Sequence, residues 1–107
     1  MGNFNGGMNE LMRQAARMQR KIEQVKKEVG DKEVSAGAVG DKVKATVTLS
    51  GKVSRIEIDP AFLESEGIEL SLDGACAAIN TALEQAEKDM EAELAKVTGG
   101  AKIPGMM

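Results

Sequence analysis

One apolar seam near the start of the chain constrains the fold more than any other feature of the sequence. Its members recur at alternating spacings of three and four residues: Met8, Leu11, Ala15, Met18, Ile22, Val25 and Val29. This pattern is typical of a helix that packs along another helix. Asn9 suits an N-cap and Gly30 suits a helix end. We therefore predict a long helix from Asn9 to Val29, preceded by a loose arm over residues 1–7 that is rich in Gly and Asn.

The middle of the chain changes from helical to alternating periodicity. Apolar and polar residues alternate over residues 43–49 and again over 54–58, on either side of the dipeptide at 50–51. Alternation of this kind predicts two strands joined by a hairpin turn. A shorter strand is predicted over residues 32–36, ending before Gly37.

The predicted hairpin loop sets a register that can be checked. A two-residue loop pairs Leu49 with Lys52, Ala45 with Ile56, Lys44 with Glu57, and Val43 with Ile58. Apolar side chains then meet on one face and opposite charges meet on the other. Val53 alone falls on the wrong face in this register.

A second helical region follows the hairpin. Asp59 and Pro60 suit the N-cap and the first position of a short helical turn that Gly67 ends. The long helix that follows is predicted from Leu72 to Val97, with Gly99 and Gly100 ending it, and residues 98–107 are expected to form a flexible tail. The apolar stripe of this helix is predicted to contain Leu72, Cys76, Ile79, Leu83, Ala86, Met90, Leu94 and Val97. The single cysteine, Cys76, is predicted to be a small buried residue of this stripe.

The element order predicts one α+β domain over residues 1–107, with a long N-terminal helix, a three-stranded antiparallel sheet and a long C-terminal helix. A strand of about seven residues spans roughly 23 Å and a helix of about 21 residues roughly 31 Å, so the helices overhang the sheet. Aromatic residues make up only 2% of the chain, and a small chain without them buries little apolar area alone. We therefore expect a two-fold homodimer, with its interface on the seam at Leu11, Ala15, Met18, Ile22 and Val25.

Charge is segregated along the chain. Residues 1–30 carry six basic and three acidic side chains, a balance of +3, which leaves −6 for the rest of a chain whose net charge is −3. The heptad places most of the basic residues on the ridge opposite the seam, where they could grip phosphates without reading bases. The candidate DNA-binding residues are Arg13, Arg17, Arg20, Lys21 and Lys27. Without further information the solvated helix face is the favoured interpretation, because most charge runs are of that kind.

The composition argues against several other classes. The chain has no His, and no Ser or Cys lies in a nucleophile motif, so we do not expect an enzyme. Cys76 has no second Cys or His beside it, so no metal or cofactor is expected. No apolar run resembles a signal peptide or a membrane span. These features favour a cytoplasmic protein.

Three segments resemble the YbaB/EbfC family of nucleoid-associated proteins. The segment GGMNELMRQAARMQ matches the opening pattern GGM-x-x-LM-x-QA-x-x-MQ, residues 56–63 resemble the signature I-x-IDP-x-LL, and the Lys-Ile-Pro-Gly tail is also similar. The resemblance covers nearly the whole chain. It implies a tweezer-shaped bacterial homodimer that binds double-stranded DNA with little sequence preference and associates with the nucleoid.

A second hypothesis comes from a different class of function. The chain could also be an adaptor directed to a protein or a ribosome, without a direct role on DNA. This hypothesis is compatible with the net negative charge of residues 31–107, the methionines of the first helix and the Ile-Pro-Gly-Met-Met tail.

Overall fold

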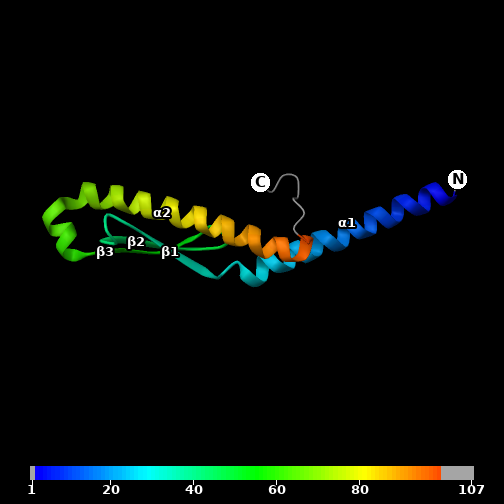
Figure 1. The fold of residues 1–107 in the computed structure, drawn as a ribbon, viewed down its shortest axis with the longest axis horizontal. Coiled ribbons are helices and arrows are strands. Elements are labelled where there is room, and N and C mark those ends of the chain that lie inside the picture. Colours follow the sequence, from blue (N-terminus) through cyan, green and yellow to red (C-terminus); the bar gives the residue numbers. More distant parts are fainter. Residues whose placement is uncertain (1, 100–107) are drawn as a thin grey trace.

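The structure, a computed structural model, describes the backbone of residues 2–99 and the side chains from Gly7 onward. Two long helices enclose three strands: α1 (Gly2–Val29), β1 (Glu33–Ala38), β2 (Val43–Thr48), β3 (Val53–Ile58) and α2 (Pro60–Thr98). The strands form one antiparallel sheet in the order β1-β2-β3. Helix α2 runs along one face of this sheet, and α1 extends beyond it (Figure 1). The predicted α+β architecture is confirmed.

Helix α1 begins at Gly2, seven residues before the predicted start at Asn9. The prediction of a loose arm over residues 1–7 is therefore wrong for residues 2–7, which continue the helix. Gly and Asn are poor helix formers, but adding a residue to an existing helix avoids the cost of nucleation. At the other end of the chain Thr98 still belongs to α2 and Gly99 caps it, whereas residues 100–107 of the predicted tail lie outside the described residues.

The hairpin between β2 and β3 follows the predicted register over most of its length. The pairs Val43–Ile58, Lys44–Glu57 and Ala45–Ile56 are as expected.

The predicted pairing fails at the turn, where a bulge between Thr46 and Val47 sets Val47 opposite Val53. The Thr48 N–H donates to the Lys52 carbonyl at 2.8 Å, so Leu49 lies in the loop and does not pair with Lys52. A bulge lets two residues on one strand oppose one on the other, and here it places Val53 on the apolar face.

Strand β1 runs from Glu33 to Ala38, past the predicted end before Gly37. Gly37 pairs with Lys44 inside the sheet, so pairing with β2 outweighs the weak strand preference of glycine. The chain reverses only after this point, where Val39 and Asp41 adopt φ values of 53° and 64°.

Local signals define both ends of α2 and its kink. The Asp59 carboxylate caps the helix by accepting a hydrogen bond from the Ala61 N–H at 2.9 Å, and Pro60 lies in the first turn of the helix. Gly67, with φ 88° and ψ 171°, breaks the helix into the predicted short and long parts. Gly99 ends it in the left-handed conformation, and its N–H donates to the Ala95 carbonyl. All three features are as predicted.

The face of α2 that packs on the sheet differs from the predicted stripe. The buried residues are mostly small: Ser71, Gly74, Ala75, Ala78, Ala82, Ala86 and Leu94. A Cβ on Gly74 would lie 3.0 Å from methyl carbons of Val39 and Val43, so helix and sheet are in close contact there. Leu72 is 54% exposed and Cys76 is also exposed, which contradicts their predicted burial. Small side chains allow this close approach, and the larger ones are turned to the flank of the helix.

Candidate nucleic-acid interface

An exposed helical arm dominates the shape of the molecule. The chain measures 76 × 20 × 18 Å, and among the helices and strands α1 packs only against α2 (Figure 1). Every residue from 7 to 21 is exposed, whereas Ile22 and Val29 are buried. We call residues 7–21 the arm. The seam of α1 is thus divided between a buried half at its base and an open half on the arm.

This division bears on the residues predicted to form a dimer interface. Ile22 is only 5% exposed and Val25 is half-buried, in the part of α1 that packs against α2 of the same chain. These two positions are therefore used within the chain. Leu11, Ala15 and Met18 remain open, and their contact with a second chain stays a prediction.

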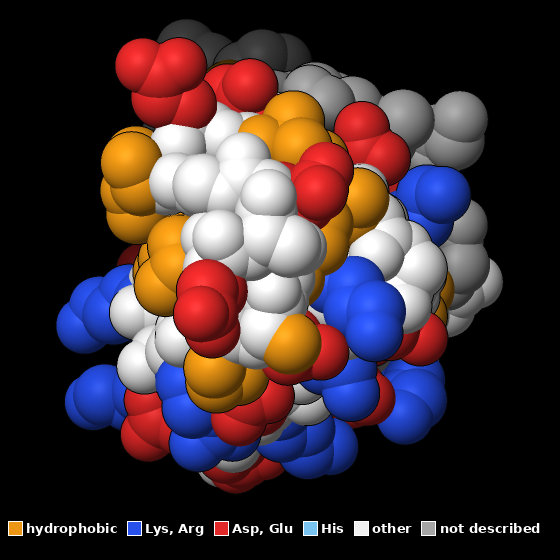
Figure 2. All heavy atoms as spheres, turned by 90° about the vertical axis from the view of Figure 1, so that its left-hand side faces the viewer, with side chains coloured by type: hydrophobic (Ala, Val, Ile, Leu, Met, Phe, Trp, Pro, Cys, Tyr) orange, Lys and Arg blue, Asp and Glu red, His pale blue; other side chains and the backbone are white. Residues whose placement is uncertain are grey.

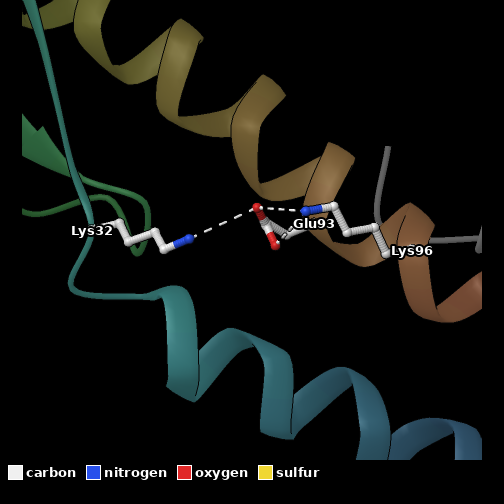
Figure 3. Close-up of polar contacts among 3 residues, drawn as sticks. All are labelled: Lys32, Glu93 and Lys96. Atoms are coloured by element: carbon white, nitrogen blue, oxygen red, sulfur yellow. Dashed lines mark hydrogen bonds and ion pairs between the residues drawn. The ribbon is translucent and has the colours of Figure 1, made fainter.

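Two ion pairs share the Glu93 carboxylate: one links the segment after α1 to α2, and the other lies within α2. Glu93 lies between Lys32, which follows α1, and Lys96, one turn further along α2 (Figure 3). Its carboxylate is 4.0 Å from the Lys32 ammonium and 3.3 Å from that of Lys96. The Glu93 side chain is 24% exposed, but those of Lys32 and Lys96 are 61% and 71% exposed. Exposed pairs of this kind contribute at most about 1 kcal/mol.

The predicted basic ridge lies on the open side of α1. The ridge consists of Arg13, Arg17, Arg20 and Lys27, and the fifth candidate, Lys21, flanks the seam; all five are exposed. Arg13, Arg20 and Lys27 follow one another at seven-residue spacing, on the side of the helix opposite the buried Ile22 and Val29. From Arg13 to Lys27 the ridge covers about 21 Å of helix.

One carboxylate on the arm, that of Glu10, lies within ion-pair distance of two of these arginines. Glu10 lies 3.8 Å from the Arg13 guanidinium and 3.5 Å from that of Arg17. All three side chains are at least half exposed, and ion pairs of this kind contribute about 0.2–1 kcal/mol. One negative charge cannot neutralise two cations, so the ridge keeps its positive balance. Sequence reasoning missed both pairs: the i,i+3 spacing of Glu10 and Arg13 could have indicated the first, whereas the pair with Arg17 spans two helical turns.

The other candidate cations are available for an external partner. Within residues 7–99, Arg20, Lys21 and Lys27 form no ion pair and no side-chain hydrogen bond. A row of exposed guanidinium and ammonium groups on a straight helix suits repeated phosphates. The exposed side of α2 has the opposite character, with acidic groups at Asp73, Glu84, Glu87 and Glu91.

Other kinds of site receive little support from the described residues. Among them, no group of three or more His, Cys, Asp or Glu side chains could hold a metal ion. Neither described helix contains an apolar stretch that would cross a bilayer. A hydrogen bond from the Ala61 N–H holds the pKa of Asp59 below its ordinary value, partly opposed by desolvation and aided by Lys42. This shift reflects the helix cap described above.

Comparisons with known proteins identify the class of protein. The sequence matches the YbaB/EbfC DNA-binding family over residues 4–101, so the chain belongs to that family. Two relatives described as nucleoid-associated proteins are similar along almost their whole length. That of Clostridium acetobutylicum is 36% identical, covering 98% of this chain and 94% of its own. That of Thermoanaerobacter sp. (strain X514) is 38% identical, covering 98% and 96%.

A solved structure supports the fold independently. The crystal structure of an uncharacterized protein from Helicobacter pylori superposes with a TM-score of 0.70, covering 85% of this chain and 96% of the other. The two sequences are 18% identical, so this similarity concerns the architecture alone.

Proposed function

We propose that the protein binds double-stranded DNA as a homodimer with little sequence preference and acts at the bacterial nucleoid in the cytoplasm. The observation that carries this proposal is the exposed arm with its ridge of arginine and lysine side chains, found in a chain that belongs to a DNA-binding family. The names of the relatives add support for a nucleoid role.

The ridge favours contact with the phosphate backbone. Arg13, Arg17 and Arg20 carry planar forks that can donate two hydrogen bonds to one phosphate. Contacts to phosphate fix the position of a protein on the duplex but carry no sequence information. Binding through these side chains would therefore be strong at low salt and nearly indifferent to sequence.

The charge distribution suggests how the molecule would be oriented. The net charge of the chain is −3, so long-range attraction to DNA must come from the arm. Glu84, Glu87 and Glu91 on α2 would be repelled by phosphates. The arm would therefore approach the duplex while the acidic side of α2 points away, and a second copy would add an equal set of contacts.

A gel-shift experiment with matched variants tests the proposal. Wild-type protein should retard unrelated duplexes of equal length to a similar extent at low salt. The triple variant Arg13→Ala, Arg17→Ala, Arg20→Ala should bind much more weakly. A control that removes the same charge elsewhere, Lys44→Ala, Arg55→Ala, Lys88→Ala, should retain binding. The absence of any shift by the wild-type protein at micromolar concentration would disprove direct DNA binding.

One observation favours the second candidate function, an adaptor for a protein or ribosomal partner. On the arm, Met8, Leu11 and Met12 are 53%, 64% and 66% exposed, and exposed apolar stripes of this kind can receive a partner helix. A pull-down from nuclease-treated lysate separates the two candidates. Partners that are retained without nucleic acid and lost on Leu11→Asp substitution would support the adaptor.

A further inference from the structure

The end of the molecule opposite the arm carries an exposed apolar patch. Helix α2 breaks at Gly67, and three large apolar residues lie within four positions of this break. Leu63, Ile68 and Leu70 are 37%, 57% and 43% exposed, and we call these three residues the apolar cap. Figure 2 looks onto this end and shows apolar side chains reaching the surface beside acidic ones. Apolar side chains that gather on a surface with a polar rim are typical of an interaction site.

The rim of the apolar cap is acidic. Its four carboxylates are all exposed: Glu64, Glu66, Glu69 and Asp73. Residues 56–87 contain no Lys or Arg, so the segment 63–73 has a charge of −4. Among the side chains from Gly7 to Gly99, none forms an ion pair with these four groups. A partner of this surface must therefore combine apolar side chains with positive charge.

The arm of the same chain has this combination. Residues 7–21 contain four basic side chains and one acidic side chain, a balance of +3. Leu11 and Met18 lie on the open seam of the arm. Lys21 flanks that seam, and Arg17 lies one turn before Lys21 on the same side of the helix. An apolar stripe with a basic border thus matches an apolar cap with an acidic rim.

Charge distinguishes between the ways in which these two surfaces can pair. Two arms facing each other bring two balances of +3 together, and two caps bring two charges of −4 together. Only an arm against a cap joins opposite charges. The contact cannot form within one chain, because arm and cap lie at opposite ends of a molecule 76 Å long (Figure 1). The matching surface is therefore that of another copy.

We propose that the arm of one copy docks on the apolar cap of the next, so that copies associate head to tail. The seam residues Leu11 and Met18 pack on Ile68 and Leu70, and Lys21 faces the acidic rim. A heterologous contact of this kind leaves one arm and one cap unused at the two ends, so it extends into an open chain of copies. It differs from the two-fold contact of a dimer and assigns the open seam to a neighbour in the chain.

The proposed contact leaves the basic ridge free. Arg13 and Arg20 lie on the side of α1 opposite the seam, so they stay exposed when the seam is covered. Each copy in the chain then presents its own ridge, and a copy bound to a duplex favours binding of the next copy. This cooperativity rests on the proposed function, whereas the head-to-tail contact itself does not require DNA.

Sedimentation velocity without DNA tests the contact. An interface centred on three large apolar residues is smaller than the standard of about 20–30 residues a side, so we expect weak and reversible association. At low salt the average size of the wild-type protein should rise with concentration beyond that of a dimer, and added salt should reverse this rise. A wild-type size that stops at the dimer would overturn the head-to-tail contact and leave the homodimer intact. A wild-type size that stays at the monomer would overturn both.

Surface variants identify the two sides of the contact. The cap variant Glu66→Lys, Glu69→Lys and the arm variant Leu11→Asp change exposed residues, so each should keep its circular dichroism spectrum. Both should lose the rise in size beyond the dimer. The control Glu33→Lys, Glu84→Lys changes the net charge by the same amount as the cap variant, also at exposed positions, and should still associate. Equal loss in the control would show that bulk charge, and not the cap, governs association.

A mixture of the two variants tests whether the contact is heterologous. The arm variant keeps an intact cap, and the cap variant keeps an intact arm. An equal mixture should therefore form one junction between the two proteins, although neither associates alone and no longer chain can grow. A cap variant that associates like the wild-type protein, together with an inactive arm variant, would overturn the proposal in favour of seam-to-seam pairing.

A charge exchange gives a gain of association that a folding defect cannot produce. The variant Arg17→Glu, Lys21→Glu should lose association, because its arm then repels the acidic rim. Combining it with Glu66→Lys, Glu69→Lys in one chain reverses both surfaces and should restore the concentration-dependent rise. Failure of the combined variant to associate would refute the pairing of arm with cap. None of these measurements involves DNA, so failure of this contact and failure of DNA binding can be distinguished.

Discussion

The salt dependence of DNA binding gives the most direct measure of the basic ridge. Each phosphate neutralised by a cation lowers the slope of log K against log salt by about 0.9 on duplex DNA. The triple variant Arg13→Ala, Arg17→Ala, Arg20→Ala removes three cations from each chain, or six from a dimer. If all six contact phosphates, the slope should become less negative by roughly 5.

The structure shows why this full effect is attainable. Arg20 has no ion pair within residues 7–99, and Arg13 and Arg17 share the single exposed carboxylate of Glu10. Exchanging such a weak pair for phosphate costs at most about 1 kcal/mol for each chain.

Fluorescence anisotropy of a labelled duplex, titrated at several salt concentrations, measures the slope. The control for this experiment is the variant Lys44→Ala, Arg55→Ala, Lys88→Ala, which brings the net charge of the chain to the same value without touching the arm. We expect its slope to stay near that of the wild-type protein. Equal flattening in both triple variants would refute the reasoning, because bulk charge and not the ridge would then govern binding.

Three further changes probe the arm, the helix–sheet contact and the helix cap. Glu10→Gln frees Arg13 and Arg17 from their shared carboxylate, so DNA affinity should rise by roughly 1.4- to 5-fold for each chain that contacts DNA, measured in the same anisotropy assay. A loss of affinity would mean that Glu10 orients the arginines for binding. Gly74→Val forces atoms between α2 and the sheet and should cost about 1–3 kcal/mol of unfolding free energy in urea titrations, whereas Ala77→Val on the exposed side should cost well under 1 kcal/mol. The hydrogen bond from Ala61 lowers the pKa of Asp59, so the stabilisation from this carboxylate is complete above its pKa in the unfolded chain and disappears as the pH falls through the folded-state pKa. Asp59→Asn retains a capping oxygen and should reduce the acid dependence of the melting temperature. An unchanged acid dependence would contradict this assignment.

Local rules account for much of the fold. The capping residues Asp59 and Gly99 act through their own backbone neighbours, and the glycine at 67 breaks the helix as its position suggested. The hairpin register followed from matching apolar and charged pairs such as Lys44 with Glu57. These features depend on contacts within a few residues or across one pair of strands, so they can be derived without knowledge of the whole molecule.

The basic ridge could be derived in the same way, although its contacts could not. Helical periodicity alone places Arg13, Arg20 and Lys27 opposite the seam, and the structure finds all three exposed. The sharing of Glu10 by two arginines and the contact between Glu93 and Lys32 depend on side-chain rotamers and on helix placement, which only the tertiary structure decides.

The packing face of α2 shows the limit of reasoning from periodicity. Leu72, Cys76, Ile79 and Leu83 repeat at core-like spacing, yet Ala78 and Ala82 face the sheet. Two stripes of apolar residues lie side by side on this helix, and nothing in their spacing says which one packs within the chain. Small side chains let the helix approach the strands more closely, and that advantage exists only when the sheet is already in place.

The sequence by itself determined the order of the elements, most of their boundaries, the main strand register and the identity of the ridge, because each arises from short-range periodicity, capping and pairing. Tertiary structure alone decided where the seam of α1 becomes uncovered, at Ile22, and which flank of α2 stays open to solvent. Both are questions of how closely a helix can approach another surface, and that distance depends on side chains far apart in the chain acting at the same time.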